Sequence, residues 1–114
     1  MKSLVKYFFA VLGLATGLSA SAAELLSRTE WPMIRSGGTL LNMPALQRVV
    51  TKLDRTENGR IIIRHPGGDP GTIWAKDLRD WLIALGVGSE SIVLEPGSGI
   101  PDTVVLDVER RGER

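Results

Sequence analysis

The sequence predicts an α+β fold: a small mixed sheet with two helices on one face, in the order β-α-β-α-β-β. Three observations lead to this expectation. Two segments have apolar residues at helical spacing, a run of isoleucines lies between them, and the apolar segments 91–94 and 103–109 follow, each bounded by turn residues. Packing both helices on one face of the sheet buries their two apolar stripes in a common core.

Residues 1–23 have the pattern of a bacterial secretory signal peptide. Lys2 and Lys6 supply a positive start, an apolar stretch follows over residues 5–18, and small residues fill positions 19–23. The alternative is an uncleaved membrane anchor, but this apolar run has about a dozen residues, whereas a membrane-spanning helix needs about 20. We therefore expect cleavage after Ala22 or Ala23 and a periplasmic protein, with membrane contact only through the uncleaved signal segment.

Charge and cysteine content narrow the classes of function. The chain has 14 Lys and Arg and 13 Asp and Glu, and loss of Lys2 and Lys6 with the signal peptide leaves 12 basic residues against 13 acidic ones. Such a nearly neutral chain shows no sign of the clustered basic face that nucleic-acid binding requires. Because the chain has no cysteine, a disulfide scaffold and thiol chemistry are excluded. We expect one domain over residues 24–109, followed by a charged tail over 110–114.

The first strand and the first helix are expected early in the mature chain. The apolar cluster over residues 31–34 indicates a short first strand, which Gly37 and Gly38 end. Asn42 is the expected N-cap of the helix, with Pro44 in its first turn. The helix then has one apolar stripe, formed by Leu46, Val49, Val50 and Leu53. The β-branched run 61–63 predicts a strand that is buried on both faces.

A second helix follows a segment rich in proline and glycine. Its composition predicts a loop over residues 64–72, with Asp69 or Thr72 as the helix cap. The helix has the clearest apolar stripe of the chain, formed by Trp74, Leu78, Trp81, Leu82 and Leu85. We interpret its two tryptophans as core residues and not as a platform for sugar rings. Gly86 is placed to end the helix in the left-handed conformation, with Val87 making the accompanying apolar contact.

Residues 80–87 read Asp-Trp-Leu-Ile-Ala-Leu-Gly-Val, and His65 follows the buried strand 61–64. Both features resemble the OmpA-like, peptidoglycan-associated domains, in which a buried strand ends in a loop with a histidine and the next helix ends in Asp-Tyr-Leu-x-x-x-Gly-Ile. The resemblance extends over roughly residues 31–109. It implies an OmpA-like fold and a place in the cell envelope.

The resemblance also implies a ligand site, from which this sequence departs. In the family, an aspartate of that loop and an arginine early in the next helix bind the diaminopimelate of the cell-wall peptide. Here Pro66 follows His65, and counting back from Asp80 places Trp74 at the position of the arginine. The usual pair is therefore not preserved. The candidate ligand-binding residues that remain are His65, Gly67, Gly68, Asp69 and Arg79.

We predict no catalytic residue, no metal and no cofactor. His65 is the single histidine, no carboxylate accompanies it at metal-ligand spacing, and no nucleophile elbow is present. The loop from Pro66 to Gly71 has the glycines of an anion-binding nest, but Pro66 and Pro70 lack N–H groups, so a plain turn is the favoured interpretation.

The expected function is therefore that of a non-catalytic periplasmic binding module whose partner is an envelope protein or the cell wall. An accessory or inhibitor-type protein that binds an envelope partner is the alternative. A small hydrolase is the least favoured hypothesis, because no nucleophile and base are paired in the sequence.

Overall fold

A computed structural model describes residues 23–31 and 35–112. One sheet contains four strands in the order β1-β4-β2-β3: β1 (Glu24–Ser27), β2 (Gly59–His65), β3 (Ile92–Pro96) and β4 (Thr103–Arg110). Strands β2 and β3 are parallel, whereas β4 is antiparallel to both β1 and β2. The sheet is therefore mixed, and the α+β class predicted from the sequence is confirmed.

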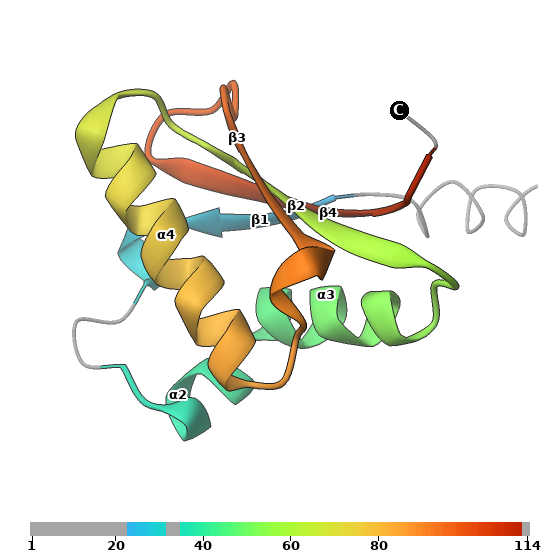
Figure 1. Ribbon diagram of the computed structural model, residues 1–114. Helices are drawn as coiled ribbons and strands as arrows, with labels where there is room; N and C mark the ends of the chain where they lie inside the picture. Colours follow the sequence, from blue (N-terminus) through green and yellow to red (C-terminus); the bar gives the residue numbers. More distant parts are fainter. Residues whose placement is uncertain (1–22, 32–34, 113–114) are drawn as a thin grey trace, which may run out of the picture.

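Two helices, α3 (Pro44–Asp54) and α4 (Gly68–Ala84), lie on the same face of the sheet (Figure 1). A short helix α2 (Gly37–Leu41) precedes α3, and single 3-10 turns form η1 (Arg28–Glu30) and η2 (Ser89–Ser91). Between the helices and the sheet lies one core, which includes the fully buried side chains Leu26, Leu40, Ile61, Ile63, Leu78, Leu82, Val104 and Leu106. Within the described ranges, no helix is long and apolar enough to cross a membrane.

The first strand lies earlier in the chain than expected. Strand β1 occupies residues 24–27, directly after the predicted signal peptide, and Leu26 is paired with Val104 of β4. Trp31 follows η1 and does not belong to a strand. The remainder of the expected strand, residues 32–34, lies outside the described residues. The prediction of a strand at Trp31 was wrong. The residues that pair with the distant strand β4 are 24–27, and so short a strand is determined by this pairing and not by a local apolar cluster.

Helix α3 has the predicted stripe but a different N-terminus. Leu46 and Val49 are buried, with Val50 and Leu53 packed at the edge of the core. The N-cap is Met43, and Asn42 instead ends α2. The N-cap was predicted wrongly because the short helix α2 takes up Asn42 as its C-cap. The sequence did not indicate α2, because this helix begins with two glycines.

The loop predicted over residues 64–72 is a tight turn. Strand β2 continues through His65, Gly67 is the N-cap of α4, and Asp69 lies in the first helical turn. Thr72 is not a cap, because its Oγ1 donates a hydrogen bond of 3.1 Å to the carbonyl oxygen of Gly68. The turn is close: a Cβ atom on Gly71 would lie 1.9 Å from the carbonyl oxygen of Pro66.

The end of α4 follows the prediction. Gly86 has a φ of 110°, in the left-handed region. Its N–H donates to the carbonyl of Ile83 over 3.0 Å, and that of Val87 donates to the carbonyl of Leu82 over 2.9 Å. These two bonds are the Schellman pattern, and Val87 is buried beside the core. The apolar stripe of α4 is likewise confirmed, with Leu78 and Leu82 fully buried.

The face of the sheet away from the helices contains a group of charges. Because side chains alternate along a strand, Arg64 points away from the core that Ile63 enters. Its guanidinium lies 3.4 Å from Glu95, 3.7 Å from Asp107 and 3.3 Å from Glu109. One arginine on the central strand β2 therefore neutralises carboxylates on both neighbouring strands.

The C-terminal strand extends slightly further than the domain boundary expected from the sequence. Arg110, expected in the charged tail, is the last residue of β4. Beyond it, Arg111 Nη2 donates to the carbonyl oxygen of Glu90 at 2.9 Å and to Ser91 Oγ at 3.0 Å. The beginning of the tail is therefore attached to the turn before β3.

Candidate functional site

The predicted ligand residues at the start of α4 have mainly structural surroundings. His65 is 5% exposed at the end of β2, and its Nδ1 donates to the carbonyl oxygen of Pro66 over 3.0 Å. Its own carbonyl accepts hydrogen bonds from the N–H groups of Gly97 and Ser98. Gly67 is the N-cap of α4, and Gly68 has a φ of 84°. The histidine and its hydrogen bonds therefore hold the turn between β2 and α4.

Asp69 and Arg79, the two charged candidates, are not brought together. Asp69 lies in the first turn of α4, and Arg79 lies ten residues later on the same helix. At a rise of 1.5 Å per residue, their Cα atoms are about 15 Å apart along the helix axis. Arg79 instead forms an ion pair of 3.4 Å with its neighbour Asp80. A single small group with an ammonium and a carboxylate does not span this distance.

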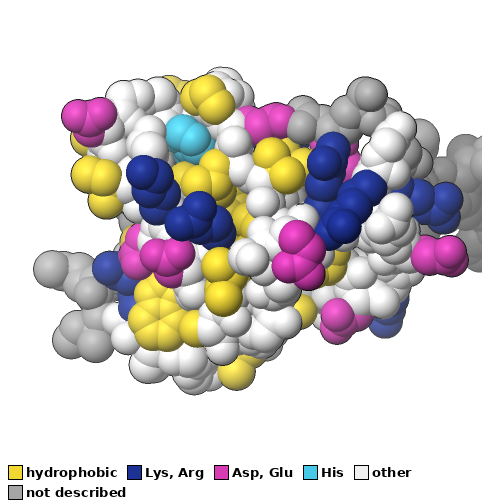
Figure 2. All heavy atoms as spheres, in the orientation of Figure 1, with side chains coloured by type: hydrophobic (Ala, Val, Ile, Leu, Met, Phe, Trp, Pro, Cys, Tyr) yellow, Lys and Arg dark blue, Asp and Glu magenta, His cyan; other side chains and the backbone are white. Residues whose placement is uncertain are grey.

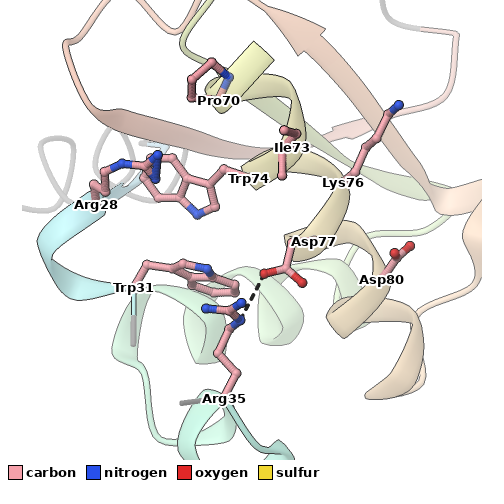
Figure 3. A pocket seen from close by; sticks show the side chains of 9 residues that line it. All are labelled: Arg28, Trp31, Arg35, Pro70, Ile73, Trp74, Lys76, Asp77 and Asp80. Atoms are coloured by element: carbon pink, nitrogen blue, oxygen red, sulfur yellow. Dashed lines mark ion pairs between the residues drawn. The ribbon is translucent and has the colours of Figure 1, made fainter. Parts of the chain in front are cut away.

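A different set of residues lines a groove of about 750 Å³, which we call the η1–α4 groove (Figure 3). Arg28, Trp31 and Arg35 form one wall, whereas Pro70, Ile73, Trp74, Lys76, Asp77 and Asp80 of α4 form the other. The two walls come from segments that are distant in the sequence. In the space-filling view, basic and acidic side chains lie next to one another over α4, with hydrophobic side chains among them (Figure 2).

The wall from α4 follows from helical spacing. Ile73, Asp77 and Asp80 lie at positions i, i+4 and i+7 and so share one side of the helix. This side lies next to the buried stripe, whose first residue, Trp74, is 4% exposed. Ile73, by contrast, is 65% exposed. The groove therefore presents an apolar side chain to solvent beside carboxylates.

The opposite wall is fixed by hydrogen bonds around η1. Both the N–H and the hydroxyl of Ser27 donate to Glu30 Oε1, each over 2.9 Å. The N–H of Arg28 donates to the carbonyl of Asp102 over 2.8 Å, and that of Trp31 donates to the carbonyl of Arg28 over 3.1 Å. These bonds hold the backbone from which Arg28 and Trp31 enter the groove.

The same bonds act on the ionisation of Glu30. The backbone N–H of Ser27, and then its hydroxyl, lower the pKa of Glu30 because both donate to the charged carboxylate. A carboxyl with a lowered pKa in the folded state stabilises that state above its ordinary pKa. It loses this effect as the pH falls through the lowered value. At neutral pH, η1 is therefore held by an ionised Glu30.

Two arginines lie over indole rings in the groove. The guanidinium of Arg28 is 5.2 Å from the ring centre of Trp74, and that of Arg35 is 5.2 Å from the ring centre of Trp31. Both distances lie within the range of cation–π attraction. Arg35 Nε also forms an ion pair of 2.9 Å with Asp77 Oδ2, which joins the two walls. Arg28 and Arg35 are thus held in place before any ligand arrives.

Trp74 has an unpaired donor. Its Nε1 is buried and has no hydrogen-bond partner among the residues that the structure describes. A buried N–H without an acceptor costs about 1–3 kcal/mol. In Figure 3 the indole lies between Arg28 and Trp31, with its nitrogen on the side of Trp31. The sequence predicted Trp74 as a core residue, which it is, but one edge of its ring also belongs to the groove.

The groove can bind by charge, by stacking and by apolar contact. Over residues 23–31 and 35–112, no three side chains of the metal-ligating types are grouped to hold a metal ion. The sequence did not reveal the groove, because neither its helical wall nor η1 has a recognisable motif. Its only signals were Trp31, a tryptophan outside both apolar stripes, and the exposed Ile73 on the polar side of α4. Comparisons with protein-family models, curated proteins and solved structures found no match for this chain.

Proposed function

We propose that this chain is a non-catalytic binding module of the bacterial periplasm that docks on an envelope protein through the η1–α4 groove. The observation that supports this proposal is the composition of the groove, which combines two tryptophans and two arginines with the exposed Ile73. Tryptophan and arginine are the residues enriched at the energetic centres of protein interfaces. Burying the exposed apolar surface of Ile73 adds a favourable term on docking.

The arrangement of the arginines favours binding further. Each guanidinium already lies over an indole ring within the range of cation–π attraction, and Arg35 is also paired with Asp77. Side chains that are ordered before binding lose less conformational entropy when a partner arrives. The groove is therefore suited to recognising one geometry of partner.

A photo-crosslinking residue placed at position 73 tests the docking surface in the periplasm. We expect a discrete adduct with one envelope protein, because Ile73 lies in the groove and is 65% exposed. The matched control is position 83, an isoleucine of the same helix that is 39% exposed and does not line the groove. No adduct from position 73, or the same adducts from both positions, would contradict the proposal.

Cell-wall binding is expected to be weak. Binding of the cell-wall peptide by OmpA-like domains needs a carboxylate and a guanidinium at a fixed spacing. Asp69 and Arg79 of this chain do not provide that spacing. In sedimentation with purified peptidoglycan sacculi, we expect little bound protein for the parent, for Asp69→Ala and for Arg79→Ala. Strong parental binding would favour the cell wall as the partner. Its loss in both variants would show that the pair acts together despite its separation along α4.

Export is expected to leave β1 intact. The predicted cleavage after Ala22 or Ala23 gives a mature N-terminus at Ala23 or Glu24, and β1 begins at Glu24. Mass spectrometry of the periplasmic fraction checks this expectation. An intact chain retained in the membrane fraction would show that the first segment is an anchor.

A further inference from the structure

We infer that the segment received by the η1–α4 groove is acidic, with a carboxylate bound by Arg28 and an adjacent apolar side chain on Ile73. This inference rests on the proposed function, because it names the chemistry of the partner's segment.

The charges of the groove are complementary to an acidic ligand. Asp77 is paired with Arg35 over 2.9 Å, and Asp80 is paired with Arg79 over 3.4 Å. Among the described residues, no carboxylate lies within ion-pair distance of Arg28 or Lys76 in the groove. Both carboxylates of the groove therefore have an internal partner, whereas two of its cations do not. An incoming carboxylate meets attraction, and an incoming cation meets repulsion.

The position of Arg28 suits a carboxylate in particular. Its guanidinium lies over the indole of Trp74, with 5.2 Å from the Arg28 Cζ atom to the ring centre. A planar guanidinium has its N–H groups in its own plane, in the fork that binds both oxygens of a carboxylate. On the side of Trp31, the buried N–H of Trp74 also lacks an acceptor among the described residues.

The apolar side chains of the groove indicate which residues should flank the carboxylate in the partner's segment. Ile73 and Pro70 lie on the same wall as Trp74, and Ile73 is 65% exposed. Figure 3 shows Trp74 between Arg28 and Ile73, with Lys76 beyond Ile73. A carboxylate at Arg28 therefore places its neighbouring residue over an apolar surface. The groove favours a short acidic segment with aliphatic neighbours over a purely charged one.

Two peptides with acetylated N-termini and amidated C-termini, so that neither end is charged, test the inference directly. The probe is acetyl-Ala-Leu-Asp-Leu-Ala-amide, whose single charge is the aspartate, and its control has asparagine in that place. Each is titrated into ¹⁵N-labelled protein while the indole N–H resonances are followed, with Trp74→Phe used to assign the Trp74 signal. We expect the aspartate peptide to shift the Trp31 and Trp74 signals and the asparagine peptide to bind about tenfold more weakly.

Variants of the protein locate the charge that is recognised. Arg28→Gln is expected to weaken binding of the aspartate peptide about tenfold or more, and Lys76→Gln to weaken it less. Arg55→Gln is the matched control. It removes the same positive charge from Arg55, which ends α3 and does not line the groove. Equal binding of the two peptides, or parental affinity in Arg28→Gln, would overturn the inference.

The two experiments separate this inference from the proposed function. If the crosslinker at position 73 gives its adduct but the aspartate peptide binds no better than the asparagine peptide, docking stands and the acidic ligand is wrong. If no adduct forms but the peptide binds through Arg28, recognition of a carboxylate stands and docking on an envelope protein is wrong.

Discussion

Gly71→Ala is expected to lower the free energy of unfolding by about 3 kcal/mol, at the upper end of the usual cost of overpacking. The added Cβ would lie 1.9 Å from the carbonyl oxygen and 2.6 Å from the carbonyl carbon of Pro66. Both are backbone atoms in a tight turn, so no side-chain rotation relieves the contact. Either α4 or the end of β2 must move, and His65, whose Nδ1 donates to the same carbonyl, moves with them. Urea denaturation measures the loss.

Gly67→Ala is the matched control for this variant. An added Cβ there meets no atom within 4 Å, and the φ of −69° is one that alanine adopts readily. Its stability is expected to stay within about 0.5 kcal/mol of the parent. If the two variants unfold at the same urea concentration, the turn between β2 and α4 is looser than the structure indicates.

Truncation of a buried leucine of α4 is expected to cause the second large loss in the free energy of unfolding. Leu78→Ala or Leu82→Ala is expected to cost about 2–5 kcal/mol, because each side chain is fully buried and leaves a cavity. A domain of this size has about 5–10 kcal/mol of stability in total. Thermal unfolding followed by circular dichroism should therefore show a large fall in melting temperature.

Ile83→Ala is the control on the same helix, since Ile83 is 39% exposed. It removes a similar apolar side chain from a position that is not in the core, and we expect a cost of about 1 kcal/mol or less. A parental melting temperature in either leucine variant would contradict the assignment of the buried face.

The sequence predicted the elements whose residues form local patterns. The apolar stripes of α3 and α4, the isoleucine run of β2 and the glycine that ends α4 were all predicted, because burial periodicity and a left-handed residue leave a local signature. Strand β1 has no such signature. Its four residues become a strand only through pairing with β4, as Leu26 does with Val104 across almost the whole domain.

The start of α4 was missed for a different reason. Its segment contains Pro70, and the surrounding glycines and prolines are typical of a loop. The first-turn N–H groups of a helix have no intrahelical partners, so a proline in that turn removes no hydrogen bond. Pro70 is the third residue of α4. Composition alone does not distinguish such a first turn from a loop.

The groove could not be predicted from the sequence, because it forms only where the segment around η1 packs beside α4 in the folded chain. Arg28 and Trp74 are more than forty residues apart, yet the guanidinium lies over the ring. This contact depends on η1, whose place is fixed by the hydrogen bond from Arg28 N–H to Asp102 beyond β3. The sequence identified Trp74 as buried, and only the fold shows that its edge also borders a surface.

The charges around Arg64 restrict the order in which this face of the sheet can change during evolution. Each of Glu95, Asp107 and Glu109 can be replaced by a neutral residue while the others keep their partner. Loss of Arg64 first removes the cation that these three half-buried carboxylates share, and like charges on adjacent strands repel, although Asp107 keeps an ion pair of 4.0 Å with Lys52. Substitutions at these positions are therefore not additive. We therefore expect loss of Arg64 to cost less stability in a lineage that has already lost one or more of these acids.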